Sequence, residues 1–288
     1  MSFLLQIILY GLALSSLSMG IFISMKIFNI PDITTDGSYT LGAVVAGVCL
    51  VKGYPLPLIF ILSFLSSALA GSITGFIGTY LKVNPLLSGI LVMTALYSIN
   101  LSIMGKANLP LIQVKNIFNV FSDGQEKPII QLWVLLSIIG IMATLLILLL
   151  KTDFGIAMRA TGNSETMVRS MGVNTNRLKI LGLALANGFI GISGFLMAQY
   201  QGYVDISMGI GIIITGLGGA GLSDAFLNKM AVPSVTIRVI GVILGTLIFQ
   251  FLTSLAISLG IDSNYLKLVT ALLVLAVVSL PLIQIKKV

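Results

Sequence analysis

The sequence lacks histidine altogether and has one cysteine and one tryptophan in 288 residues. The single thiol, Cys49, can form no internal disulfide bond, and without histidine it cannot belong to an ordinary four-ligand zinc site. The chain also has no Gly-x-x-x-x-Gly-Lys-Ser/Thr loop and no His-Glu-x-x-His motif. We therefore expect no catalytic residues, no metal and no cofactor in this chain, and any ATP that drives it to be bound elsewhere.

Charged residues are scarce as well. They make up only 9% of the chain, whereas hydrophobic residues make up 57%, and the mean hydropathy is +1.09. A soluble domain has about a quarter of its residues charged. The composition therefore predicts an integral membrane protein.

Long apolar runs fill most of the sequence. Seven are long enough to cross a hydrocarbon core, which takes about 20 helical residues: 4–25, 57–81, 85–104, 129–150, 180–203, 239–259 and 266–284. Two shorter, glycine-rich runs near 38–51 and 208–222 predict broken or partial spans. Strands of a β-barrel would alternate apolar and polar residues and would not sustain such runs. We expect an all-α bundle of about eight or nine transmembrane helices in one domain over 1–288.

The basic residues indicate how the chain is oriented. With the polar segment 152–179 in the cytoplasm, 11 of the 16 lysines and arginines lie inside and five lie outside. This asymmetry predicts an external N-terminus, a cytoplasmic C-terminus and an odd number of crossings. It also makes 105–128 the longest external loop. The net charge of +7 lies in these short loops, so we expect lipid as their partner and no nucleic acid.

Two similar motifs stand immediately before the short glycine-rich runs. Asp32-Ile-Thr and Asp205-Ile-Ser are each followed by glycine, and about five crossings separate them, which predicts inverted repeats. In that case both motifs begin interrupted helices whose free amide groups and hydroxyls line a substrate path. The candidate path residues are Thr34, Thr35, Asp36, Gly37, Ser38, Asp205, Ser207, Gly209 and Thr215. Alternatively, the aspartates are N-caps in the headgroup region and the glycines let helices pack closely.

The segment 152–179 has the pattern of a short helix on a membrane surface. Asn163 or Ser164 can cap a helix of about two turns with Glu165 in its first turn, and Gly172 can end it in a left-handed turn. An apolar ridge and a polar rim are expected on this helix. The ridge consists of Met167, Val168 and Met171, and the rim of Arg159, Glu165 and Arg169. Alternatively, the segment is a basic loop that only fixes topology and binds anionic headgroups.

The run from Thr152 to Asn163, with the turn that follows Arg169, resembles the cytoplasmic loop of ABC importer permeases of the branched-chain amino acid and ribose type. Those proteins share a Gly-x-x-x-Arg-Ala-x-Gly run, a short helix and a Gly-Val or Gly-Ile turn. The matching residues are Gly155, Arg159, Ala160, Gly162, Gly172 and Val173. Thr35–Ala43 and Gly216–Gly221 are similar to two further signatures of the group, so the resemblance covers most of the chain. Val168 departs from the pattern, which often has alanine there.

The resemblance implies the permease subunit of a bacterial ABC importer in the cytoplasmic membrane. The Thr-Thr-Asp-Gly motif and the compact length are most similar to permeases for tryptophan and tyrosine import. The implied partners are a second copy of the chain, a cytoplasmic ATPase that binds ATP and Mg, and an extracytoplasmic substrate-binding lipoprotein. The implied ATPase-coupling residues are Gly155, Arg159, Ala160, Gly162, Asn163, Glu165, Met167, Arg169, Met171, Gly172 and Val173.

Two other classes of protein fit the sequence less well. In an ion-coupled secondary transporter, Asp36 or Asp205 would bind a coupling ion at a broken helix. Against this, both acids are predicted at helix ends. An intramembrane enzyme would need a Ser–Lys or Asp arrangement, since histidine and paired mid-span acids are absent.

Overall fold

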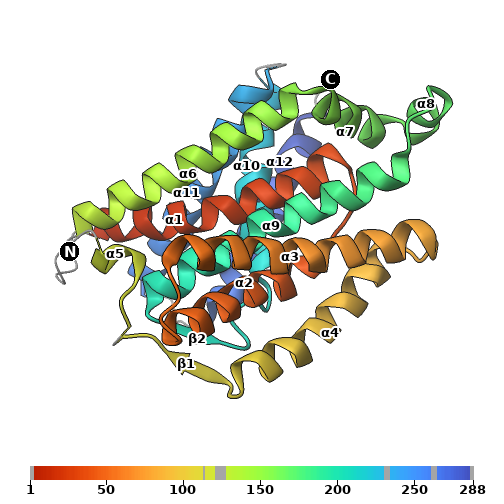
Figure 1. Ribbon diagram of the computed structural model, residues 1–288. Coiled ribbons are helices and arrows are strands. Elements are labelled where there is room, and N and C mark those ends of the chain that lie inside the picture. The colour runs from red at the N-terminus through yellow and green to blue at the C-terminus, as the bar shows by residue number, and fades with distance from the viewer. Residues whose placement is uncertain (1–2, 113, 121–127, 230–233, 261–264, 286–288) are drawn as a thin grey trace.

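The computed structural model describes residues 3–112, 114–120, 128–229, 234–260 and 265–285, which are almost entirely helical (Figure 1). The first half of the chain contains α1 (Phe3–Ile21), its π-helical continuation η1 (Phe22–Ile27), α2 (Thr34–Val51), α3 (Leu56–Tyr80), α4 (Pro85–Met104), β1 (Asn108–Pro110), α5 (Ile117–Val120) and α6 (Pro128–Lys151). The second half contains α7 (Asp153–Asn163), α8 (Glu165–Ser170), α9 (Thr175–Gln201), β2 (Tyr203–Asp205), α10 (Ile212–Lys229), α11 (Val235–Ser258) and α12 (Leu266–Ile285).

Nine apolar helices coincide with the nine predicted runs. Seven are long and apolar enough to span a membrane, and α10 and α12 are shorter apolar helices in the part of the chain that the structure describes. Helices satisfy every backbone hydrogen bond internally, which the hydrocarbon core demands. The protein is therefore an all-α polytopic membrane protein, as the composition predicted.

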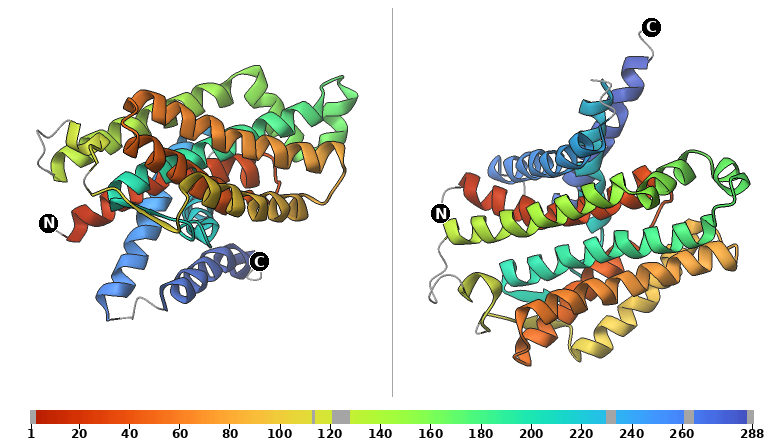
Figure 2. Two further views of the ribbon diagram at one scale, coloured as in Figure 1. Left: turned by 60° about the horizontal axis from the view of Figure 1, so that its bottom comes forward. Right: turned by 45° about the horizontal axis from the view of Figure 1, so that its top comes forward.

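α1 and α9 form the centre of the bundle. Within their most apolar windows, 89% of the α1–η1 residues and 83% of the α9 residues are buried, against 28% for α3 and α4. In the right-hand view of Figure 2, α10–α12 lie on one side of α1, and α3 and α4 lie beyond α9 on the other. Glycine permits the close helix contacts: a Cβ atom on Gly42 of α2 would lie 2.1 Å from the carbonyl oxygen of Gly191 in α9. This agrees with small-residue packing.

The two short glycine-rich runs differ in the structure. α2 is one continuous helix of 18 residues, so the prediction that it is broken was wrong. Its start nevertheless lies short of the end of α3, because the Thr34 hydroxyl lies 2.7 Å from that of Thr74, six residues before α3 ends at Tyr80. With a rise of 1.5 Å per residue, α2 begins about 9 Å inside the end of α3. The other run does contain an interruption, since turns at 206–211 precede α10.

A short antiparallel ladder at one end of the bundle was not predicted. β1 pairs with β2 in the register Asn108–Asp205, Leu109–Val204 and Pro110–Tyr203. Three residues per strand are too few to produce a recognisable alternation in the sequence. The ladder fastens the first part of the loop 105–128 to the bundle, where Leu109 is 7% exposed.

Candidate functional site

The polar segment after α6 forms two helices, and an N-cap residue determines where each of them begins. The hydroxyl of Thr152 accepts a hydrogen bond from the Gly155 amide at 3.4 Å, which caps α7. Ser164 caps α8 by accepting from the Met167 amide, also at 3.4 Å. Gly172 then adopts φ +84°, in the left-handed region that glycine favours. The predicted helix with its cap and glycine turn is confirmed. Asn163 is the last residue of α7, so Ser164 is the cap.

α7 was not predicted as a separate helix. Two of its glycines, Gly155 and Gly162, allow it to pack closely against its neighbours. A Cβ atom on Gly162 would lie 1.8 Å from the carbonyl oxygen of Ile27, and one on Gly155 would lie 2.4 Å from Leu150 Cα. These two glycines therefore allow α7 to contact both η1 and the end of α6. Arg159 strengthens the second contact, since Nη2 donates to the Leu150 carbonyl oxygen at 3.4 Å. Arg159 is partly buried against the backbone and does not belong to the predicted polar rim.

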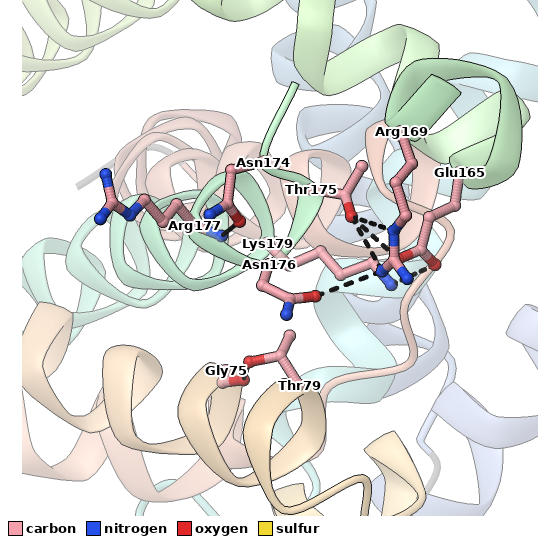
Figure 3. Close-up of polar contacts among 9 residues, drawn as sticks. All are labelled: Gly75, Thr79, Glu165, Arg169, Asn174, Thr175, Asn176, Arg177 and Lys179. Atoms are coloured by element: carbon pink, nitrogen blue, oxygen red, sulfur yellow. Dashed lines mark hydrogen bonds and ion pairs between the residues drawn. The ribbon is translucent and has the colours of Figure 1, made fainter. Parts of the chain in front are cut away.

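Glu165 ties α8 to the start of α9 (Figure 3). Its Oε2 lies 2.5 Å from Lys179 Nζ, and its Oε1 lies 2.9 Å from Arg169 Nη2. The hydroxyl of Thr175 donates to the same Oε1 at 3.1 Å and accepts from Arg169 Nη2, also at 3.1 Å. Lys179 and Thr175 were not among the predicted residues, because they belong to the next apolar helix. The network holds the connection between α8 and α9 in one geometry.

The exposed apolar surface of this segment differs from the predicted ridge. Met167 is 59% and Met171 71% exposed, whereas Val168 is only 3% exposed, so Val168 is not part of the ridge. The reason is helical geometry, since consecutive residues point about 100° apart. Ile156 on α7 is also exposed and was missed because α7 was not predicted. Two exposed methionines, one on α8 and one directly after its last residue, suit an adaptable protein contact.

The Glu165 network gives a testable pH dependence. The hydrogen bond from Lys179, together with the nearby positive charges, holds the pKa of Glu165 below its ordinary value. The contribution to stability is therefore fully present above the ordinary glutamate pKa of about 4.3 and is lost as the pH falls through the lower folded-state pKa. We expect Glu165→Gln to lower the thermal midpoint more at pH 7 than at pH 3. Equal losses at both pH values in thermal unfolding would contradict the network.

A second polar site joins the starts of α2 and α10 within the bundle. Asp36 Oδ2 accepts from the Gly211 amide at 2.7 Å, and Oδ1 accepts from the Ile213 amide at 3.1 Å. Gly209 allows this approach, because a Cβ atom there would lie 2.1 Å from the Asp36 carbonyl oxygen. Asp32, 1% exposed, accepts from the Thr34 amide at 2.9 Å and from Asn187 Nδ2 at 2.7 Å. The amides of Thr34, Gly211 and Ile213 are therefore occupied by carboxylates.

The remaining predicted path residues do not gather at one surface. Thr34, Thr35 and Ser38 are completely buried between helices, and Gly37 packs against α4. Asp205 and Ser207 lie by the β1–β2 ladder, where Asp205 accepts from the Ser207 amide at 2.8 Å and from Asn108 Nδ2 at 3.3 Å. The hydrogen bonds from Ser207 hold the pKa of Asp205 below its ordinary value. The proposed role of these residues in a substrate path stays a prediction.

Thr215 alone of the predicted path residues lines a cavity of about 470 Å³ in the bundle. The wall comes from α1, α9, α10, α11 and α12. It consists of Phe3, Gln6, Ile7, Tyr10, Leu14, Tyr200, Ile212, Thr215, Gln250, Thr253, Ser254, Ile257, Leu266 and Thr270. Most of these residues were missed because residues from five helices meet here only after folding.

The sequence that folds into this bundle and its α7–α8 pair matches a known family. The family described as "Branched-chain amino acid transport system / permease component" matches residues 3–278. The chain belongs to this permease family. Its membership confirms the resemblance inferred from the α7–α8 motif, and the permease is a component of a transport system, not itself an enzyme.

Individual relatives agree with the family. The permease is 38% identical over 276 residues to the tyrosine transport system permease protein of Clostridioides difficile strain R20291, covering 96% of this chain and 90% of that protein. It is 30% identical over 271 residues to an uncharacterised protein of Rickettsia prowazekii strain Madrid E, covering 93% and 94%. It is 25% identical over 268 residues to the autoinducer 2 import system permease protein LsrC of Escherichia coli O9:H4 strain HS, covering 91% and 73%. No solved structure matches significantly.

Proposed function

We propose that the permease is the transmembrane subunit of a bacterial ATP-driven ABC importer. The α7–α8 pair supports this proposal most strongly. Gly162 seats α7 on η1, Glu165 fastens α8 to α9, and Met167 and Met171 stay exposed. A force applied to these methionines would reach the spanning helices through rigid contacts. ATP binding and hydrolysis on a cytoplasmic ATPase subunit, which holds ATP and Mg, would then switch the permease between outward and inward access.

The proposed orientation places α7 and α8 in the cytoplasm of a cell with the permease in its cytoplasmic membrane. In Figure 1, the N-terminus lies at the end of the bundle opposite α7 and α8, and the C-terminal end of α12 lies toward α7. This arrangement agrees with an external N-terminus, a cytoplasmic C-terminus and an odd number of crossings. Apolar side chains on α3, α4, α6 and α11 are exposed, which suits lipid and a second copy of the chain in a homodimer.

The proposed cargo is an amino acid, and specifically an aromatic one, delivered by an external substrate-binding lipoprotein. The similarity to a tyrosine transport system permease over almost the full length of both chains supports this class. A secondary transporter is less well supported. Both carboxylate oxygens of Asp36 already accept amide hydrogen bonds, and Asp205, half-buried at the end of β2, accepts hydrogen bonds from Ser207 and Asn108.

The exposed methionines give the test of this function. We expect the permease to co-purify with its ATPase subunit, and the double variant Met167→Glu, Met171→Glu to lose that subunit, because two charges would have to be desolvated at the contact. Ile112→Glu is the matched control, since Ile112 is 84% exposed beside the β1–β2 ladder. Pull-down from detergent with each variant measures the effect. Retention of the ATPase by the double variant, or ion-driven uptake by the permease alone, would overturn the proposal.

A further inference from the structure

The cavity lined by Thr215 has the properties of a ligand site. Its volume of about 470 Å³ falls within the range of roughly 300–1,000 Å³ that is usual for sites of small organic molecules. Its wall is mostly apolar, and no lining residue carries a formal charge. An uncharged wall disfavours an ion or a fully charged solute, because nothing would replace the hydration of the charge. The cavity therefore suits the neutral part of an amphipathic molecule.

The wall contains polar side chains that have no hydrogen-bond partner in the described part of the protein. Gln6, Tyr10, Tyr200 and Thr215 make no side-chain hydrogen bond to any described residue. They stand on three helices, α1, α9 and α10, around one space. Such groups can donate to or accept from a ligand hydroxyl without first breaking an internal bond. A small set of polar groups in an apolar wall is what orients a ligand.

The aromatic residues of the wall favour an aromatic ligand. The rings of Tyr10 and Tyr200 lie edge to face, with centroids 6.2 Å apart and planes at 71°. A third ring can stack or meet an edge at this pair in the geometries that aromatic groups prefer. Ile212 and Leu14 provide further apolar contact. Together with the unpartnered hydroxyls, this wall fits a phenol better than an aliphatic chain.

We propose that this cavity binds the aromatic side chain of an aromatic amino acid during import. The inference rests on the proposed importer function and names a place for its cargo. The first residues of α1 and α12 and the last turns of α9 and α11 surround the cavity, and all four ends are external in the proposed orientation. The cargo's charged amino and carboxylate groups stay at the mouth in water. The aromatic ring of the cargo contacts Ile212. The next residue, Ile213, donates its amide hydrogen bond to Asp36, so cargo binding would act on the start of α10.

The single native cysteine makes a direct test possible. In a Cys49→Ala background, Thr215→Cys and Gln6→Cys each place one thiol in the cavity, and Lys52→Cys places one on the exposed turn after α2. A membrane-impermeant methanethiosulfonate reagent modifies the thiols in proteoliposomes without ATPase, in the presence of L-tyrosine or L-leucine. At a tyrosine concentration ten times its dissociation constant, we expect modification in the cavity to slow about tenfold by mass action. Leucine should protect neither thiol, and Lys52→Cys should react equally throughout.

The outcomes separate the cavity from the importer function. If L-tyrosine protects neither cavity thiol, or if the impermeant reagent reaches neither, the cavity assignment is overturned. ATP-dependent uptake of L-tyrosine by the Cys49→Ala permease with its ATPase and binding protein is measured in parallel. Uptake without protection would reject the cavity and retain the importer. Protection with uptake that depends on an ion gradient and needs no ATPase would retain the cavity and reject the importer.

Discussion

Gly162→Ala is expected to reduce ATP-driven uptake by at least tenfold, corresponding to about 1.4 kcal/mol or more, while the helical bundle stays folded. The new Cβ atom would lie 1.8 Å from the carbonyl oxygen of Ile27 and 3.1 Å from Phe28 Cα. Both are backbone atoms, so no side-chain rotation relieves the clash. Overpacking of this kind costs about 1–3 kcal/mol, and α7 can escape it only by leaving η1. The ATPase would then move α7 without moving α1.

The experiment compares uptake and ATP hydrolysis in the reconstituted system. Gly140→Ala on α6 is the matched control, because an added Cβ meets no heavy atom within 4 Å and alanine is the better helix former. We expect the control to transport normally, and Gly162→Ala to hydrolyse ATP with little uptake. Normal uptake by a correctly folded Gly162→Ala permease would show that the contact between α7 and η1 does not transmit force.

The parts of the fold that could be predicted depend on the lipid environment. A run of about 20 apolar residues crosses a hydrocarbon core as a helix, because no water is present there to form hydrogen bonds with exposed backbone groups. The runs that became α3, α4 and α6 therefore gave nearly correct ends. The two ends of α8 could also be predicted, because the residues that begin and end it, Ser164, Glu165 and Gly172, all lie within one short stretch of sequence.

Contacts between distant residues could not be predicted. The Asp36 carboxylate accepts hydrogen bonds from amides 175 and 177 residues away, and nothing in the sequence around Asp36 predicts these donors. The two Asp-Ile-Thr/Ser motifs illustrate the same limit. Asp32 and Asp205 each accept from the amide two residues later, at 2.9 and 2.8 Å. Their local geometry agrees, yet Asp32 is buried against Asn187 and Asp205 is only half-buried. Inverted repeats stay a prediction.

α10 connects the cavity with the α7–α8 pair. Its first turn lines the cavity at Ile212 and Thr215 and is held by Asp36. Further along, Asp224 pairs with Lys26 of η1 at 2.7 Å, and η1 is the element on which α7 rests. A movement of α7 would therefore reach α10 through η1. α10 is therefore the helix through which a movement of α7 would reach the proposed cargo cavity.

Asp36→Ala is expected to separate the start of α10 from α2 and to lower uptake by at least about tenfold. The substitution removes two charge-assisted hydrogen bonds of about 1.5–3 kcal/mol each and leaves the Gly211 and Ile213 amides without their acceptor. The thermal midpoint of the purified permease should fall as well. Asp205→Ala is the matched control, because Asp205 is only half-buried and its hydrogen-bond partners Ser207 and Asn108 are exposed, so water can replace the lost carboxylate and the loss of stability should be smaller than for Asp36→Ala.

Asp36→Asn distinguishes two roles for Asp36: a structural residue that joins α2 to α10 through hydrogen bonds, here called a clasp, and an acid that binds a coupling ion. Asparagine keeps one acceptor oxygen for an amide but carries no charge. If Asp36 acts as a clasp, uptake and thermal stability should both fall between the values for the native permease and Asp36→Ala. If Asp36 instead bound a coupling ion, Asp36→Asn would abolish uptake with stability unchanged. Because both oxygens already accept amides at 2.7 and 3.1 Å, we expect the graded result.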